Sequence, residues 1–160
     1  MSEKSVRLEQ LMPLIRERLE QGHNVSFFPR GISMLPMLRQ GRDCVILSPV
    51  PEKLKKYDLP LYQREDGSYV LHRIVRVGET YTCVGDNQFQ LEYGLEHRQM
   101  IALVTAFERD GRRIEVSDPV YRLYCRFWVM SRPVRRIWRG GLWRLKRIIG
   151  RYVSWRKTRP

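Results

Sequence analysis

Cysteines and long apolar runs are scarce in this chain. Its 160 residues include three cysteines, Cys44, Cys83 and Cys125, which lie far apart and form no C-x-x-C pair. That number and spacing argue against a disulfide scaffold or a zinc ribbon and favour a reducing compartment. No stretch approaches the about 18 apolar residues that a transmembrane helix needs, and the N-terminus lacks the apolar run of a secretory signal. We therefore expect a cytoplasmic protein without a signal peptide or a membrane-spanning helix.

Acidic residues are missing from the last quarter of the chain. The segment from Tyr121 to Pro160 holds 13 of the 30 Lys and Arg and all four tryptophans, but no Asp or Glu. The preceding residues hold the other 17 basic residues and all 17 acidic ones, so the formal charge of +13 comes from this tail. Such a separation of charge predicts two parts with different roles.

The spacing of the apolar residues predicts a helix, then strands, then helices again. From Ser5 to Gln21 the apolar residues follow a helical period, and Gly22 is a plausible end of that helix. From Val25 to Ser117, short segments rich in Val, Ile, Tyr, Phe and Thr recur about every ten residues, which is typical of a small barrel or sandwich. We predict a mainly β fold: an N-terminal helix at 1–24, a β-rich, barrel-type domain at 25–118, and a basic, Trp- and Arg-rich amphipathic helical tail at 119–160.

Ser33 and His72 are the residues whose surroundings point most directly to chemistry. Ser33 follows a glycine turn and precedes Met-Leu-Pro in "RGISMLPML", and a serine hydroxyl needs a neighbouring base to act as a nucleophile. His72 lies inside the predicted strand "SYVLHRIVRV", where an imidazole can be held rigidly and accept a proton near neutral pH. The loop "GDNQFQLE" offers Asp86 and Glu92 as a third group that orients the base. We interpret the two other histidines, His23 and His97, as surface groups.

Four short motifs occur in an order that resembles a known peptidase family. They are "GISMLPML", "YDLPLYQ", "YVLHRIV" and "VGDNQ", and together they span roughly Phe27 to Phe107. Their order and spacing resemble the signal peptidase I-like serine peptidases, which are related in fold to the LexA-type repressor peptidases. Bacterial members usually have Lys as the base, whereas His72 is similar to the archaeal and endoplasmic-reticulum branch. In that branch the acid after the Gly-Asp-Asn motif is usually Asp; here Glu92, Asp86 or a simple Ser–His dyad remain the alternatives.

The resemblance implies a serine endopeptidase that uses no metal or cofactor. Ser33 would attack a peptide carbonyl, and His72 would take its proton and return it to the leaving amine. The Ser33 backbone N–H and a neighbour near Gly31 would meet the oxyanion, and Met34 and Pro36 complete the motif that positions the nucleophile. The substrate would be an extended peptide paired along a strand edge, as in signal peptide processing. We expect no counterpart of that family's membrane anchor in this chain, and no helix-turn-helix pattern supports a repressor.

The basic tail allows three interpretations. Its apolar and aromatic residues at helical spacing, interleaved with arginines, favour a peripheral position on an anionic membrane surface. The residues that we expect at this surface are Arg135, Arg136, Trp138, Arg139, Trp143 and Arg147. Alternatively the tail binds nucleic acid, or its apolar side packs on the β-rich domain. The corresponding rival functions are a non-catalytic module that binds a peptide or partner, and a basic protein associated with nucleic acid.

Overall fold

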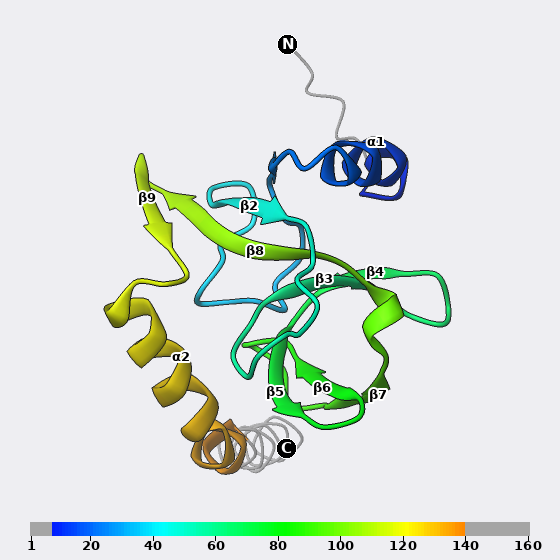
Figure 1. Cartoon of the computed structure of the whole chain (residues 1–160). Coiled ribbons are helices and arrows are strands. Elements are labelled where there is room, and N and C mark those ends of the chain that lie inside the picture. Colours follow the sequence, from blue (N-terminus) through cyan, green and yellow to red (C-terminus); the bar gives the residue numbers. More distant parts are fainter. Residues whose placement is uncertain (1–7, 140–160) are drawn as a thin grey trace, which may run out of the picture.

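The computed structural model describes residues 8–139, which fold into two antiparallel sheets flanked by helices (Figure 1). The first helix, α1 (Leu8–Glu20), buries Met12, Ile15 and Leu19, which recur every three or four residues and so lie on one side of the helix. Gly22 follows with a φ of 78°, a left-handed conformation that glycine adopts without strain. The predicted N-terminal helix is therefore confirmed, with its glycine end.

Nine strands form the two sheets of the described chain. The larger sheet has the order β1 (Val25–Phe27), β2 (Cys44–Ser48), β8 (Met100–Arg109), β3 (Pro60–Gln63) and β4 (Tyr69–Leu71), with β9 (Arg112–Glu115) paired to β8. The smaller sheet contains β5 (Arg73–Val77), β6 (Tyr81–Val84) and β7 (Glu92–Leu95). A short 3-10 helix, η1 (His97–Gln99), leads from β7 into β8.

The predicted barrel is not found in residues 8–139, where the strands form two open sheets. The strand order of the larger sheet runs from β1 to β4, and no pairing between β1 and β4 closes it into a barrel. The reason lies at His72, where the chain leaves β4 and enters β5 of the other sheet instead of continuing around a barrel. Together with the helices, the described part is a mixed α and β domain whose strands are mostly antiparallel.

Two details of the predicted strands are also wrong. The segment "SYVLHRIVRV" is two strands of different sheets, with His72 between them and not inside a strand. Glu92 is the first residue of β7 and not a loop residue. Alternating apolar residues run through both regions without a break, and periodicity alone does not show where a strand changes sheets.

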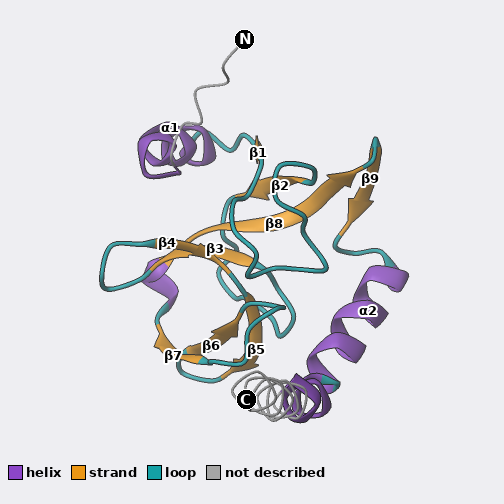
Figure 2. Cartoon of the chain, turned by 180° about the vertical axis from the view of Figure 1, so that it is seen from behind, coloured by secondary structure: helices purple, strands orange, loops and turns teal. Residues whose placement is uncertain are grey.

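The C-terminal helices cover one side of the sheets (Figure 2). Helix α2 (Pro119–Met130) begins at Asp118, whose carboxylate accepts hydrogen bonds from the backbone N–H groups of Val120 and Tyr121. Tyr121 and Cys125 on this helix are buried in the same core as α1, β2 and β8. A second helical segment follows at 132–139. The beginning of the tail therefore packs on the sheets, while Trp143 and Arg147 lie outside the described residues.

No helix within residues 8–139 combines the length and the hydrophobicity that crossing a bilayer requires.

Candidate active site

Ser33 lies in the turn-rich segment between β1 and β2, which backbone hydrogen bonds hold against the loop after β6. The backbone N–H of Asn87 donates to the Ser33 carbonyl at 2.8 Å, and the Asn87 side-chain amide donates to the Ile32 carbonyl at 3.1 Å. Gly31 has a φ of 92°, and its N–H donates to Gln40 Oε1 at 2.9 Å. Gly31 thus provides the unusual backbone angle before Ser33, while its own N–H is already engaged.

The next two residues of the motif differ in exposure. Met34 is buried in the main core, whereas Pro36 is exposed and follows a cis peptide bond from Leu35. Met34 therefore anchors the segment on the core side, and Ser33 itself is only half-buried. Ser33 is therefore partly exposed, while the hydrogen bonds from Asn87 and the buried side chain of Met34 hold the backbone around it.

His72 is buried and paired with Glu92. The distance from His72 Nδ1 to Glu92 Oε1 is 2.8 Å, and His72 is 1% exposed. A carboxylate can only accept, so Nδ1 carries the proton and the lone pair is on Nε2. Nε2 is buried and has no hydrogen-bond partner among residues 8–139. The imidazole is therefore held in the tautomer whose free nitrogen is a base.

Two residues that we did not single out from the sequence complete the setting of Glu92. Tyr62 donates its hydroxyl to Glu92 Oε2 at 2.9 Å, and Arg64 donates to both carboxylate oxygens at 2.8 and 2.6 Å. Tyr62 is in β3 and Arg64 directly follows that strand, so the two residues are two positions apart and their side chains reach the same carboxylate. The alternation in "LPLYQR" indicates that Tyr62 and Arg64 share one side of the chain. Only the fold shows that this side contacts Glu92.

The pKa values of the pair follow from burial and from these contacts. Burial raises the pKa of the Glu92 carboxyl, but hydrogen bonds from Arg64 and Tyr62 and the charges of His72 and Arg64 outweigh it and hold this pKa below its usual value. Burial is the largest influence on His72 and lowers its pKa, against the opposing effect of Glu92. Hence Glu92 is ionised and His72 is neutral near neutral pH, which suits a general base.

Gly85 lies close to both the Ser33 backbone carbonyl and the His72 ring. A Cβ atom at Gly85 would lie 2.7 Å from the Ser33 carbonyl oxygen and 3.1 Å from His72 Nε2. A side chain here would clash with the Ser33 carbonyl and crowd the His72 ring, so glycine permits the close approach of both. No hydrogen bond joins Ser33 Oγ to Nε2 in the described residues, because Nε2 has no partner there. The Ser33 backbone and the His72 ring thus lie close to the same glycine, and no hydrogen bond joins the two side chains.

Asp86, the alternative partner for His72, is directed elsewhere. Its carboxylate accepts from Arg73 Nε at 2.8 Å and from Arg73 Nη2 at 2.7 Å, and both residues are almost fully buried. Arg73 also donates to the Tyr57 carbonyl, the Tyr121 hydroxyl and Cys125 Sγ. The geometry therefore favours Glu92 as the group that orients His72, and it places Asp86 in a buried, bidentate ion pair with Arg73.

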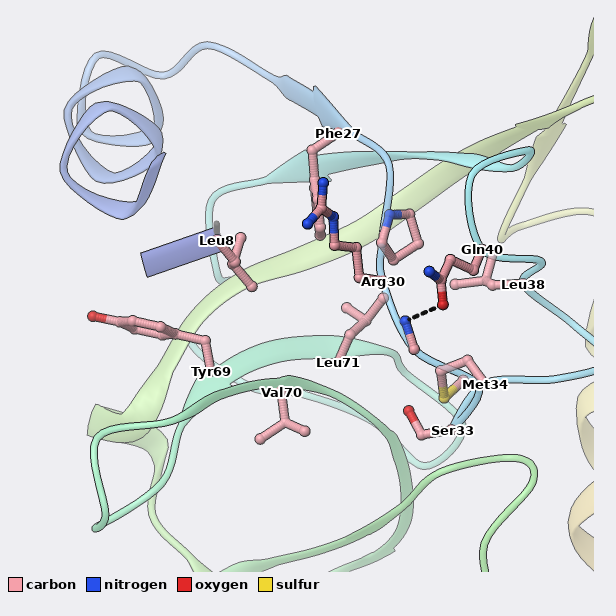
Figure 3. A pocket seen from close by; sticks show the side chains of 12 residues that line it. Leu8, Phe27, Arg30, Ser33, Met34, Leu38, Gln40, Tyr69, Val70 and Leu71 are labelled. Atoms are coloured by element: carbon pink, nitrogen blue, oxygen red, sulfur yellow. Dashed lines mark hydrogen bonds between the residues drawn. The ribbon is translucent and has the colours of Figure 1, made fainter. Parts of the chain in front are cut away.

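A small cavity opens beside Ser33 (Figure 3). Its volume is about 80 Å³, and it is lined on one side by the chain from Phe27 to Met34 and on the other by β4. In Figure 3, Ser33 faces Val70 and Leu71 of β4 across this space. Because β4 pairs only with β3 among the described strands, its second edge is available for another extended chain.

The predicted membrane-surface residues fall into two groups. Arg135 and Arg139 face the loop after β6: Arg135 donates to the Asp86 carbonyl, and Arg139 donates to the Asn87 carbonyl and side-chain oxygens. Arg136 and Trp138 are exposed. Trp128, which we did not single out, donates its indole N–H to the Asp86 carbonyl at 2.9 Å. The C-terminal helices thus hold the loop that itself holds Ser33.

The remaining residues considered from the sequence form no part of the His72–Glu92 pair, although Cys83 lies opposite Glu92 where β6 pairs with β7. His23 is exposed, and His97 is exposed with its Nδ1 3.2 Å from the Tyr81 hydroxyl. Cys44, Cys83 and Cys125 are buried and free. Among residues 8–139, no group of three or more His, Cys, Asp or Glu side chains is arranged to hold a metal ion.

Comparisons of the chain with protein families, with curated proteins and with solved structures found no significant match.

Proposed function

We propose that the protein is a serine endopeptidase similar to signal peptidases, with Ser33 as nucleophile and His72 as general base. The observation that carries the proposal is the His72–Glu92 pair, which leaves a buried and unpartnered Nε2 against Gly85, next to the Ser33 backbone. A neutral imidazole oriented by a carboxylate is what a serine hydroxyl needs for activation.

The proposed reaction is acyl transfer in two steps. His72 Nε2 takes the proton of Ser33 Oγ as this oxygen bonds to the substrate carbonyl carbon, and the proton then passes to the leaving amine as the peptide bond breaks. Water attacks the resulting ester with His72 again as base, which releases the acid and restores Ser33. The oxyanion would accept from the Ser33 backbone N–H. A hydrogen bond between Oγ and Nε2 is expected to form when substrate binds, since such bonds are often not formed in free enzymes.

The cavity beside Ser33 supports an extended peptide as substrate. A segment lying along the free edge of β4 would place its backbone against that strand and one small side chain in the cavity. A volume of about 80 Å³ favours a small residue at this position.

The test compares the wild type with Ser33→Ala and His72→Ala on peptides that have small residues before candidate cut sites. Products are read by mass spectrometry, and a serine-directed phosphonate reports on Ser33. Cleavage and labelling are expected in the wild type and lost in both variants, while Ser117→Ala and His23→Ala, which change exposed residues of the same types, retain them. A wild type that neither cleaves nor reacts would refute the proposal.

A second candidate is a non-catalytic module that binds a peptide in the same cavity. The observation that favours it is the missing hydrogen bond between Ser33 and His72. It predicts peptide binding that is unchanged in Ser33→Ala and no reaction of Ser33 with the phosphonate.

A further inference from the structure

We infer that the outer side of α2 is a docking face for an anionic lipid bilayer. The inference goes beyond the proposed catalysis, because it concerns a surface that shares no residue with the candidate active site. It also extends the surface expected from the sequence, which began at Arg135.

The docking face consists of large apolar residues that the fold leaves uncovered. Those on α2 are Val120, Leu123, Phe127 and Met130, and those on the following segment are Val134, Ile137 and Trp138. Each is at least 65% exposed, whereas most other large apolar side chains of residues 8–139 are buried or partly buried. The four on α2 recur at intervals of three and four residues, so they form one stripe along the helix.

The stripe does not serve the packing of α2 on the sheets. Tyr121 and Cys125 are buried on the other side of the helix and bond to Arg73, and Trp128 bonds to the loop after β6. Helix α2 therefore has apolar residues on two sides, and only one of these sides packs on the rest of the described chain. A side that is exposed and apolar over the whole helix marks a site of interaction.

The charge beside the stripe identifies the occupant. Arg122 and Arg126 are exposed next to it, and the chain contains no Asp or Glu after Asp118. A second copy of this face would bring arginines against arginines with no carboxylate to pair them, which opposes self-association. A nucleic acid would satisfy the arginines but leave the apolar stripe in water. An anionic bilayer accommodates both, because acyl chains take the stripe and headgroups pair with the guanidinium groups.

The first experiment measures co-sedimentation of the full chain, in the Ser33→Ala background, with vesicles of phosphatidylcholine alone or mixed with phosphatidylglycerol. The double substitution Leu123→Gln with Phe127→Gln is expected to weaken binding to mixed vesicles at least about tenfold, since two exposed apolar side chains no longer enter the bilayer. The matched control, Leu14→Gln with Val77→Gln, changes exposed apolar residues elsewhere and should bind like the parent. Equal binding of both doubles would overturn the inference.

The second comparison tests the charge. Arg122→Gln with Arg126→Gln is expected to lower binding to mixed vesicles about tenfold or more and to leave the weak binding to neutral vesicles unchanged. The control is Arg76→Gln with Arg112→Gln, which removes two exposed arginines from other elements. If the control loses binding to the same extent, vesicle binding depends on net charge alone, which contradicts a docking face on α2.

Three further outcomes would assign the face to another occupant and overturn the inference. One is a dimer in sedimentation velocity that Leu123→Gln with Phe127→Gln disperses. Another is binding to an oligonucleotide that is as strong as binding to mixed vesicles and is lost in the same double variant. The third is a lower urea midpoint of that variant without vesicles, which would mean that another part of the same chain covers the face. Because none of these measurements requires cleavage, they stand or fall independently of the peptidase proposal.

Discussion

His72 owes its setting to the corner where the chain passes from one sheet to the other. Its neighbour Leu71 ends β4 and Arg73 begins β5, so the imidazole is buried between the sheets with Glu92 of β7 at 2.8 Å. Desolvation makes the neutral imidazole the stable form, while the carboxylate fixes its tautomer. One residue thereby combines a rigid position with a base that stays unprotonated near neutral pH.

The pH dependence of Ser33 labelling should reveal this pair. His72 must be neutral to act, and its lowered pKa means that activity falls only at a pH below the ordinary histidine pKa. Glu92→Gln keeps the shape but removes the charge that raises the His72 pKa, so the acid limb should move to still lower pH and the labelling rate should fall about 100-fold or more. The measurement is labelling rate against pH, with Glu65→Gln, an exposed carboxylate, as control. An unchanged acid limb in Glu92→Gln would contradict the assignment.

Gly85→Ala should disturb the same centre by steric means alone. The added methyl would meet the Ser33 carbonyl at 2.7 Å, and relief requires a backbone shift. We expect a loss of about 1–3 kcal/mol in the free energy of unfolding and a slower labelling of Ser33. Gly78→Ala, whose Cβ would meet its nearest atom at an ordinary 3.7 Å, is the control. Equal urea midpoints and labelling rates in both variants would show that the approach at Gly85 is not tight.

At the level of elements, α2 and the segment 132–139 fix the loop after β6 from outside. Trp128 and Arg135 donate to the Asp86 carbonyl, and the Arg135 guanidinium lies 3.8 Å from the centre of the Trp128 ring. From inside, Arg73 holds the Asp86 carboxylate. The same loop holds Ser33 through Asn87, so the C-terminal helices are connected to the candidate nucleophile through a short series of hydrogen bonds.

Removing one link of that series should affect Ser33. Trp128→Phe keeps the ring contact but loses the indole donor, so it should cost about 1 kcal/mol of unfolding free energy and slow the labelling of Ser33 severalfold. The control lies on the same helix: Tyr124→Phe removes a buried hydroxyl that has no hydrogen-bond partner among residues 8–139, so stability should be unchanged or slightly higher. Stability and labelling are measured by urea titration and phosphonate reaction. If Tyr124→Phe proves as costly as Trp128→Phe, the hydrogen bond is not the cause.

Considered as a whole, the described chain has one main core to which its first and last helices both contribute. Residues of α1 and α2 belong to one core cluster, which also contains residues of β2 and β8. Breaking α2 away would expose Tyr121 and Cys125 and leave Arg73 with fewer partners in the interior, which is costly for a buried charge.

The helices and sheets should therefore unfold in one transition. All four tryptophans lie after Tyr121, so a variant with Trp138, Trp143 and Trp155 each changed to Phe leaves Trp128 as a probe of the tail alone. We expect its fluorescence and the far-UV circular dichroism, which reports mainly on the whole fold, to give the same urea midpoint. A tail transition at lower urea would contradict this cooperative unit.

Several elements and one pair of residues could be predicted from the sequence because they depend on local patterns. The period of the apolar residues located α1 and most strands, and the residues around Ser33 and His72 selected these two as candidate nucleophile and base. Tyr62 and Arg64 could not be found in this way, because their contact with Glu92 joins strands about 30 positions apart in the chain. The choice between Asp86 and Glu92 stayed open for the same reason: both carboxylates are near His72 in sequence order, and only their directions differ.

The sequence by itself determined the separation of charge and the β-rich middle between helices, since these follow from composition and local periodicity, and its local motifs named Ser33 and His72 as candidates. Only the tertiary structure decided that the strands form two open sheets, that His72 stands at the corner between them, and that Glu92 and not Asp86 contacts it. It also decided which side of α2 is buried and which is left to solvent. These features depend on how strands and helices distant in the chain pack together, and such packing is set by the whole core and by no single segment.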